Sequence, residues 1–405
     1  MTNAAARDLG QSAMSAFRAD IPLGGLELTR VDHDTLTVAT ILRHASVASR
    51  STASRMLRDA RRKAKESLGK ARLEEGCHAD PAGPRHPLDV FRLLAERCNE
   101  RGQIHVEDHI LESLERLAVP DSLTAGRIAY RRARAAWELG ERDMAEARVT
   151  SMLASKAGRE FDELKVRGWT VQAIISYEQG NLPKLRELAL RGLRESRGRY
   201  PQLETLLWQN LGVAAALSKD FNGALQLLWK GYDLTKTARM PRENGILQNM
   251  SQLLLDTGHP GAARAGFARA LAESPGRRAA YTLLGGYATA SAELADPSGV
   301  EWATRQVLLL AKRRGAHQRD LAHGLLECAE ALAACGQDAR AGTLRRRSLQ
   351  LSQRYGFHDL IFRAQPTTKR ASPTKTQWTG CAEEIVARVR EMEPATMPHE
   401  LAYAD

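Results

Sequence analysis

Residues 203–234, LETLLWQNLGVAAALSKDFNGALQLLWKGYDL, decide the fold, because most of the chain after residue 84 can be aligned with them. Trp208, Leu211 and Gly212 share one face of a predicted helix. Across a turn, Ala224 lies in a second predicted helix, and small residues at such positions let two helices cross closely. The stretch therefore predicts a helix, a turn and a second helix that pack together as a hairpin.

The turn of this hairpin recurs along the chain at a nearly constant spacing. Matching turn positions are Gly102, Gly140, Gly180, Lys219, Gly258 and Gly336. The first five positions are 38, 40, 39 and 39 residues apart, and the last interval, 78 residues, is two periods. A degenerate copy is therefore expected near residue 297, where Asp296 and Pro297 supply a turn.

Seven helix pairs with a 39-residue period resemble the tetratricopeptide repeat, in which each copy is a helical hairpin that buries its apolar face against its neighbours. The copy in residues 247–275 fits the family pattern best. Its turn, small, aromatic, small and stop positions are Gly258, Ala263, Phe267, Ala270 and Pro275. The resemblance covers residues 85–364 and is specific for the fold, but it says little about function.

Other copies depart from the family pattern. The aromatic position of the first helix is filled by Phe91, Trp169 and Trp208 in three copies, but by Ala129, Leu247 and Leu325 in others. The period also exceeds the family's usual length of about 34 residues, which implies helices longer by about a turn. Arrays with such a long period are similar to the sensing halves of bacterial transcription regulators, both the peptide-responsive kind and the maltose-activator kind.

Composition agrees with an all-α chain. Hydrophobic residues make up 43% of the 405 residues and aromatic residues only 5%, which suits helices packed through Ala and Leu and offers little material for a sheet. We expect an α-solenoid of about seven such hairpins in residues 88–364. A basic segment (residues 1–75) and a linker (76–87) precede it, and a tether with a short helix (365–405) follows.

The net charge of +11 and the pI of about 9.6 indicate nucleic acid, anionic lipid or acidic proteins as partners. The charge is unevenly distributed, because residues 42–73 hold ten Lys or Arg residues against Asp59 and Glu66. Within this segment, VASRSTASRMLRDAR (residues 47–61) resembles the recognition helix of bacterial repressors, in which a serine-rich turn leads into a helix that reads base edges.

That resemblance implies a nucleic-acid-binding surface. The residues expected to enter the major groove are Arg50, Ser51, Thr52, Ser54 and Arg55, and those expected to contact phosphates are Arg58, Arg61, Arg62 and Lys63. The alternative is a basic, solvated helix that packs on the repeats as an N-terminal cap. A count of helices in residues 1–75 would distinguish the two, since a DNA-binding module needs three.

No pattern supports catalysis or a cofactor. The chain has no glycine-rich phosphate loop with its lysine and no Gly-x-Ser-x-Gly elbow. His105 and His109 are four residues apart, as metal ligands on a helix would be, but no Cys-x-x-Cys accompanies them. We therefore expect no enzyme, no metal and no cofactor. Five cysteines, the lack of a signal peptide and the lack of a long apolar run favour a cytoplasmic protein.

The C-terminal run CAEEIVARVREME (residues 381–393) has an apolar stripe formed by Ile385, Val386 and Val389. It could dock on a partner or fold back on the last repeat. Because terminal repeats need a cover for their exposed apolar face, we expect it to cap the end of the array, which the pattern places at Gly356 and Phe357.

In tetratricopeptide hairpins the first helix lines a concave groove, and the resemblance assigns groove positions along this chain. Early copies place there Arg127, Tyr130, Arg131, Arg134, Trp137, Arg167 and Tyr177, middle copies Gln209, Asn210, Gln248, Asn249 and Gln252, and later copies Glu327 and Glu330. The arginines suit an acidic side chain or a C-terminal carboxylate.

The pairs Gln209-Asn210 and Gln248-Asn249 recur one period apart. Because a side-chain amide offers both a donor and an acceptor, these pairs predict a ladder that holds an extended peptide; the alternative is that they fill a wet surface. The sequence thus favours a transcription regulator that binds DNA through its N-terminal segment and senses a peptide or protein, with a homodimer left open. The alternative is a scaffold or adaptor without DNA binding.

Overall fold

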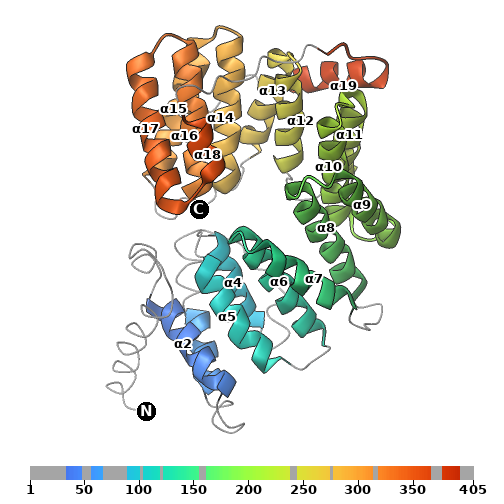
Figure 1. The fold of residues 1–405 in the computed structure, drawn as a ribbon, viewed down its shortest axis with the longest axis vertical. Coiled ribbons are helices and arrows are strands. Elements are labelled where there is room, and N and C mark those ends of the chain that lie inside the picture. The colour runs from blue at the N-terminus through green and yellow to red at the C-terminus, as the bar shows by residue number, and fades with distance from the viewer. Residues whose placement is uncertain are drawn as a thin grey trace. The chain divides into compact units, whose positions relative to one another are not determined.

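The computed structural model describes residues 33–47, 56–66, 89–100, 104–118, 122–154, 161–237, 244–273, 277–312, 318–365 and 376–392. All regular structure in these residues is helical, which confirms the all-α class (Figure 1). None of the described helices is long and apolar enough to cross a membrane. Contacts divide the chain into two units, residues 1–175 and residues 176–404, with the boundary inside one helix.

Unit 1 consists of helices that pack in chain order. They are α2 (His33–Val47), a helix at residues 56–66, α4 (Asp89–Glu100), α5 (Ile104–Leu117), α6 (Leu123–Glu138), α7 (Arg142–Ala154) and the start of α8 (Asp162–Glu178). α4 packs against α5, α5 against α6 and α6 against α7. This local order is what hairpin repeats predict, because each copy buries its apolar face against its neighbours.

The N-terminal helices belong to the core of unit 1. Val38 and Leu42 of α2 and Ala60 and Ala64 of the helix at 56–66 are buried in the same cluster as Phe91 of α4. The described part of residues 1–75 thus holds two helices, which extend the α4–α5 hairpin. The residues predicted to enter the major groove, Arg50, Ser51, Thr52, Ser54 and Arg55, lie outside the described residues.

Unit 2 begins with the end of α8 and continues the hairpins. Its helices are α9 (Leu182–Ser196), α10 (Pro201–Leu217), α11 (Phe221–Thr237), α12 (Asn244–Asp256), α13 (Pro260–Ala272), α14 (Arg277–Glu293), α15 (Pro297–Ala311), α16 (Gln318–Ala334), α17 (Asp338–Tyr355), α18 (His358–Arg363) and α19 (Cys381–Arg390). Four hairpins pack internally, α10 on α11, α12 on α13, α14 on α15 and α16 on α17. The first helices α10, α12, α14 and α16 also contact one another in that order, so they form one face of the unit.

The predicted turn positions that the structure describes share one backbone conformation, and Gly102 lies outside the described residues. Positive φ angles occur at Gly140, Gly180, Lys219, Gly258, Ala295 and Gly336. In each turn the next residue donates its N–H to a carbonyl five residues back, as from His259 to Leu254 at 2.8 Å. This pattern ends a helix through one left-handed residue. The degenerate turn expected near residue 297 is confirmed, because Asp296 follows Ala295 and accepts hydrogen bonds from the backbone of the first turn of α15.

Small residues are needed where the helices cross. A Cβ added at Gly212 of α10 would lie 2.6 Å from Leu228 Cγ of α11, and one added at Gly324 of α16 would lie 2.7 Å from the backbone oxygen of Tyr281 in α14. Both approaches are shorter than any normal van der Waals contact of a methyl group. The prediction that glycine lets the hairpin at residues 203–234 close is therefore confirmed.

The C-terminal helix does not cap the last repeat, so that prediction is wrong. The array continues beyond Gly356 into α18, whose Leu360 and Ala364 pack on Ala322 and Leu326 of α16. α18 thereby covers part of the face that the C-terminal run was expected to cover. α19 packs instead against α11 and α13, on the opposite side of unit 2 from α17 in the view of Figure 1.

Candidate functional site

Two pairs of amide side chains, one period apart, lie on the face of unit 2 formed by the first helices. We call Gln209, Asn210, Gln248 and Asn249 the amide wall. All four are half-buried, on α10 and α12. The Nδ2 atom of Asn210 is buried and has no hydrogen-bond partner among the described residues. An amide nitrogen without a partner in a dry position carries a free-energy cost of about 1–3 kcal/mol, so a rotation of the side chain that brought this donor to a ligand acceptor would be favoured.

The amide wall is continuous across three helices. A Cβ added at Gly245, in the first turn of α12, would lie 3.7 Å from both amide atoms of Gln209, so the α10 side chain reaches α12. Gln248 in turn accepts a hydrogen bond from the Thr282 hydroxyl of α14 at 3.3 Å. Gln252, the last predicted amide of α12, donates instead to Asp256 Oδ1 on its own helix at 2.8 Å. The Gln252 amide nitrogen is therefore already hydrogen-bonded within α12.

The packing of α12 explains why its amides stay on the surface of the core. Leu247, Met250 and Leu254 are fully buried in the core cluster of unit 2. These positions follow a spacing of three and four residues, which forms one face of a helix. Gln248 and Asn249 fall between them, at the edge of that face, where they are half-buried.

The arginines predicted to bind an acidic ligand lie in unit 1, and three of them, Arg131, Arg134 and Arg167, have carboxylate partners. Arg131 forms an ion pair and a hydrogen bond with Glu107, a side chain of α5 that is 1% exposed. Asn99 Nδ2 of α4 lies 2.8 Å from Glu107 Oε2 and 2.8 Å from Glu138 Oε2. Burial raises the pKa of Glu107 to about 7, although Arg131 and the Asn99 amide act in the opposite direction.

Arg134 and Arg167 are paired in the same way. Arg134 bonds Glu138 at 3.1 Å, and Arg167 donates to Glu163 at 3.0 and 2.7 Å while its guanidinium stacks over the Tyr130 ring. The pKa of both arginines is raised by these neighbours even though burial opposes it. Arg127 is exposed, as is Tyr177 at the unit 2 end of α8. The arginine set and the amide wall belong to different units, and the structure defines each by itself.

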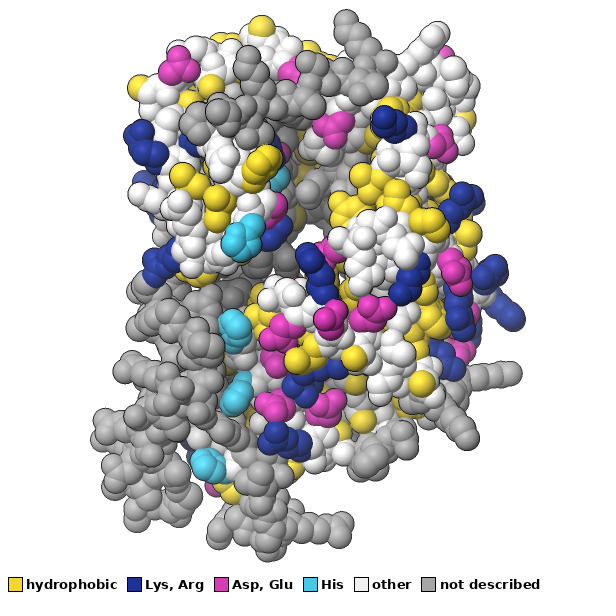
Figure 2. All heavy atoms as spheres, viewed as in Figure 1, with side chains coloured by type: hydrophobic (Ala, Val, Ile, Leu, Met, Phe, Trp, Pro, Cys, Tyr) yellow, Lys and Arg dark blue, Asp and Glu magenta, His cyan; other side chains and the backbone are white. Residues whose placement is uncertain are grey.

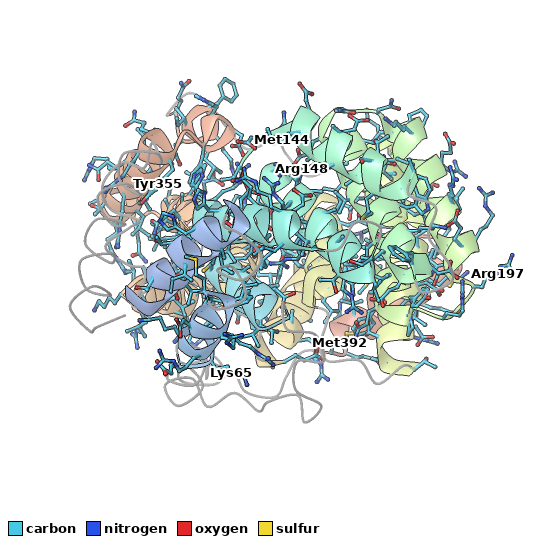
Figure 3. All side chains as sticks on the ribbon, turned by 90° about the horizontal axis from the view of Figure 1, so that it is seen from below. Lys65, Met144, Arg148, Arg197, Tyr355 and Met392 are labelled. Atoms are coloured by element: carbon cyan, nitrogen blue, oxygen red, sulfur yellow. The ribbon has the colours of Figure 1, made fainter. Side chains whose placement is uncertain are left out.

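A further network in unit 1 was not predicted. Arg132 of α6 is 9% exposed and bonds Asp108 at 3.1 Å as well as Glu115, both on α5. Arg148 of α7, labelled in Figure 3, reaches Asp108 at 3.4 Å and the Arg132 carbonyl at 3.0 Å. Figure 2 shows acidic and basic side chains interleaved over these helices. Only the excess of arginine on the predicted helices hinted at such pairing.

Unit 2 has a related cluster at its C-terminal end. Arg363 of α18 makes two hydrogen bonds to Glu330 of α16, at 3.1 and 2.6 Å, and lies 3.7 Å from Glu327. These two carboxylates were expected in the groove. Arg363 was missed because the hairpin pattern ended at Gly356 and Phe357, so no groove position was assigned after them. The pKa of Arg363 is raised by the carboxylates, although its burial opposes this.

The basic N-terminal residues are only partly described. Arg58 and Arg62 are exposed on the helix at residues 56–66, whereas Arg61 and Lys63 are half-buried. Arg62 lies 3.8 Å from Asp59. The exposed pair gives this helix a basic edge, while its alanines face the core of unit 1.

The candidate metal ligands do not come together. Among the residues that the structure describes, no group of three or more His, Cys, Asp or Glu side chains could hold a metal ion. His105 is exposed on α5 and His109 is half-buried. Cys328 is fully buried, which raises its pKa to about 12 and keeps the thiol protonated.

Neither family models nor curated proteins match this chain. Two Rap proteins are among the solved structures that resemble it. The apo form of RapI has a TM-score of 0.50 at 12% identity, covering 67% of this chain and 100% of RapI. A Rap protein complexed with Competence and Sporulation Factor has a TM-score of 0.53 at 12% identity, covering 87% of this chain and 93% of that protein. At such low identity the likeness concerns the fold alone, and this chain shares with these two proteins an architecture of stacked, tetratricopeptide-like helical hairpins.

Proposed function

We propose that this chain is a regulatory repeat protein that binds an extended segment of a peptide or protein on its amide wall. The observation that carries the proposal is the buried Asn210 Nδ2, which has no partner among the described residues. It lies in one of two amide pairs that recur one period apart. A peptide carbonyl that met this donor after the Asn210 side chain rotated to the surface would remove its cost.

The spacing of the amide wall suits an extended backbone. Packed helices lie roughly 8–10 Å apart, and an extended chain rises about 3.3 Å per residue. The amides of α10 and α12 would therefore meet peptide groups about three residues apart. Because each amide can donate and accept, it can pair with the N–H and the C=O of a peptide regardless of the peptide's side chains.

The proposal rests on the amides rather than on the arginines. Arg131, Arg134 and Arg167 each hold a carboxylate of their own chain, so a ligand carboxylate would have to displace an existing partner. The bound factor of the similar Rap protein supports peptide or protein binding on stacked hairpins as a working hypothesis for this chain. An adaptor that joins two proteins would use the same wall.

The first prediction concerns Asn210 and Asn249. The probe is the tightest binder selected with the full chain from a display library of unstructured peptides, measured by calorimetry. Asn210→Ala combined with Asn249→Ala should weaken binding about 5- to 150-fold, since each lost hydrogen bond costs roughly 0.5–1.5 kcal/mol. Thermal stability should not fall, because neither side chain belongs to the core cluster and the substitution removes the unpaired Asn210 amide.

Gln226→Ala is the matched control, since this exposed amide lies on α11, the second helix of its hairpin. It should leave the affinity unchanged. If the selected peptide binds the double variant as tightly as the wild type, or if no peptide is selected at all, the amide wall is a structural surface and the proposal fails.

The second candidate function is DNA binding through the N-terminal segment, favoured by the exposed Arg58 and Arg62. Full-length Arg58→Ala with Arg62→Ala should then bind duplex DNA more weakly, with a salt dependence of log K shallower by nearly 2, because two phosphate contacts are lost. Filter binding across salt concentrations measures both quantities. An unchanged slope would leave the adaptor without DNA contact as the better description.

A further inference from the structure

The C-terminal segment of the described chain, residues 376–392, lies across two hairpins of unit 2. Ala382, Ile385, Val386 and Val389 are buried against α11 and α13 and belong to the core cluster of the unit. They form one face of α19. The opposite face carries charged side chains such as Glu383 and Glu384, which are exposed. The segment is therefore an amphipathic helix with one docked face.

Polar contacts fix the start of this segment at the ends of the same two hairpins. The Thr376 N–H donates to the Thr257 carbonyl at 3.3 Å, and His259 Nε2 donates to the Thr376 carbonyl at 3.1 Å. The His259 ring lies 5.7 Å from the ring of Trp378, which is 6% exposed. These contacts belong to the turn between α12 and α13.

The α10–α11 hairpin holds the segment as well. Asn222 Oδ1, at the start of α11, accepts from the Thr379 backbone N–H at 3.2 Å. Further along, the Arg388 guanidinium lies over the Trp229 ring of α11, 5.8 Å from its centroid. The segment is thus tied to both hairpins by side-chain chemistry as well as by apolar burial.

The groove between α11 and α13 is shaped for a helix. A Cβ added at Gly266 of α13 would overlap Ser251 Oγ of α12 and lie 3.3 Å from Val389 Cγ1, so this glycine lets α12 pack closely and also leaves room for α19. α11 and α13 already have packing partners within their own hairpins, α10 and α12. The segment occupies a site on the hairpins rather than completing one of them.

We propose that this groove is a second binding site, that its ligand is the amphipathic segment 376–392 of the same chain, and that its occupancy sets the spacing of the amide wall. The two hairpins that the segment bridges are the ones whose first helices, α10 and α12, carry the four amides. The coupling of the groove to the amide wall rests on the proposed function, whereas the docking of the segment in the groove does not.

The thermodynamics of a tethered ligand explain how such a site works. An isolated helix of this length is hardly stable in water, so the segment folds as it docks. Residues 366–375 join it to the array, which keeps its effective concentration at the groove high. Any partner that binds the segment's apolar face would compete with the groove. If the docked segment changes the affinity of the amide wall for a peptide, a bound peptide must change the affinity of the groove for the segment by the same factor.

Release of the segment is tested in the full chain with Ile385→Asp combined with Val389→Asp. Trypsin should then cleave after Arg388 and Arg390 about tenfold faster or more, because a docked helix must open locally before it is cut. Glu383→Gln with Glu384→Gln, on the exposed face, is the matched control and should cleave like the wild type. A second variant, Trp378→Ala with Asn222→Ala, removes two contacts of the segment without placing a charge in the core. It replaces the first variant if the aspartates unfold unit 2.

Occupation of the groove is tested with a fluorescein-labelled synthetic peptide of residues 376–392. By fluorescence anisotropy it should bind the released variant but not the wild type, whose groove is filled. Equal cleavage of all variants, or no binding of the peptide to either released variant, would overturn the proposal. A dimer of the wild type that dissociates when α19 is altered would overturn the assignment of the ligand to the same chain.

Coupling is tested with the library peptide selected on the full chain. The released variant should bind that peptide with an affinity changed about fivefold or more, and the 376–392 peptide added in trans should restore the wild-type value. If the wild type selects no peptide, the proposed function fails while the groove experiments still decide the groove. If wild type and released variant bind the selected peptide equally, the coupling is wrong although the proposed function stands.

Discussion

Two turn residues are held in a conformation that their side chains disfavour. Lys219 and Ala295 have φ angles of 62° and 54°, at positions where four other turns have glycine. A left-handed conformation costs a residue with a Cβ roughly 1–2 kcal/mol, and glycine loses part of that advantage through its greater freedom in the unfolded chain. These two turns therefore persist because the packed hairpins hold them.

The prediction is that Ala295→Gly stabilises the protein by about 0.5–1 kcal/mol. The measurement is the midpoint of urea denaturation followed by circular dichroism. Ala147→Gly, an exposed position inside α7, is the control and should instead destabilise by about 1 kcal/mol, because there the residue is helical. A loss of stability in Ala295→Gly would show that the turn is not strained.

A second residue-scale prediction follows from Glu107, whose pKa rises from 4.5 to about 7 on folding. The folded state then binds more protons than the unfolded state between these values. The contribution of Glu107 to stability is therefore fully present below pH 4.5 and is lost as the pH rises through about 7. Glu107→Gln should remove this fall, as measured by urea denaturation at a series of pH values. Identical pH profiles for wild type and variant would contradict the burial argument.

The residue scale also shows why the ion pairs of the predicted arginines were not foreseen. The pairs Arg134–Glu138 and Arg167–Glu163 are four residues apart on one helix, so they could have been seen in the sequence. Arg131 and Glu107 are 24 residues apart on different helices, and their pairing depends on how α5 and α6 pack. Groove positions taken from the hairpin pattern cannot tell whether a cation is already paired.

At the scale of elements, glycines on both helices let α14 and α16 cross closely, and Gly324 is the one that meets the backbone of its partner helix. The nearest atom to a Cβ at Gly324 is the backbone oxygen of Tyr281, which cannot rotate away as a side chain can. Gly324→Ala should therefore destabilise the protein by about 1–3 kcal/mol in urea denaturation, through overpacking. Gly342→Ala in α17 is the matched control, because there the nearest atom is the end of the Arg346 side chain at 3.6 Å.

In that control the substitution should be neutral or stabilising by up to about 1 kcal/mol, as alanine favours a helix. Equal effects of the two substitutions would mean that α14 and α16 can separate without cost.

The sequence predicted the helices and turns well because small residues and turn residues act locally. It did not predict where α19 docks, because an apolar stripe such as that of Ile385 and Val389 records that a helix is buried but not against which surface.

At the scale of the whole molecule, the 39-residue period predicted the order of packing, since each hairpin contacts mainly its chain neighbours. The division into two units inside α8 was not predicted, because the repeat pattern continues through that helix. The segment 376–392 breaks the local rule, as it returns from the end of the chain to α11 and α13. Contacts between distant parts of a chain leave no periodic signal, which limits what the sequence could predict.

The open glycine turns have a practical consequence. At Gly140, Gly180 and Gly336 a Cβ would meet nothing within 4 Å, so these turn tips project away from the packed helices. Exposed turn tips tolerate inserted sequence well, because few buried contacts depend on them. Fluorescent labels or affinity epitopes can thus be introduced at regular intervals along the array. Such reporters would let the motion of each hairpin be followed separately while a partner binds.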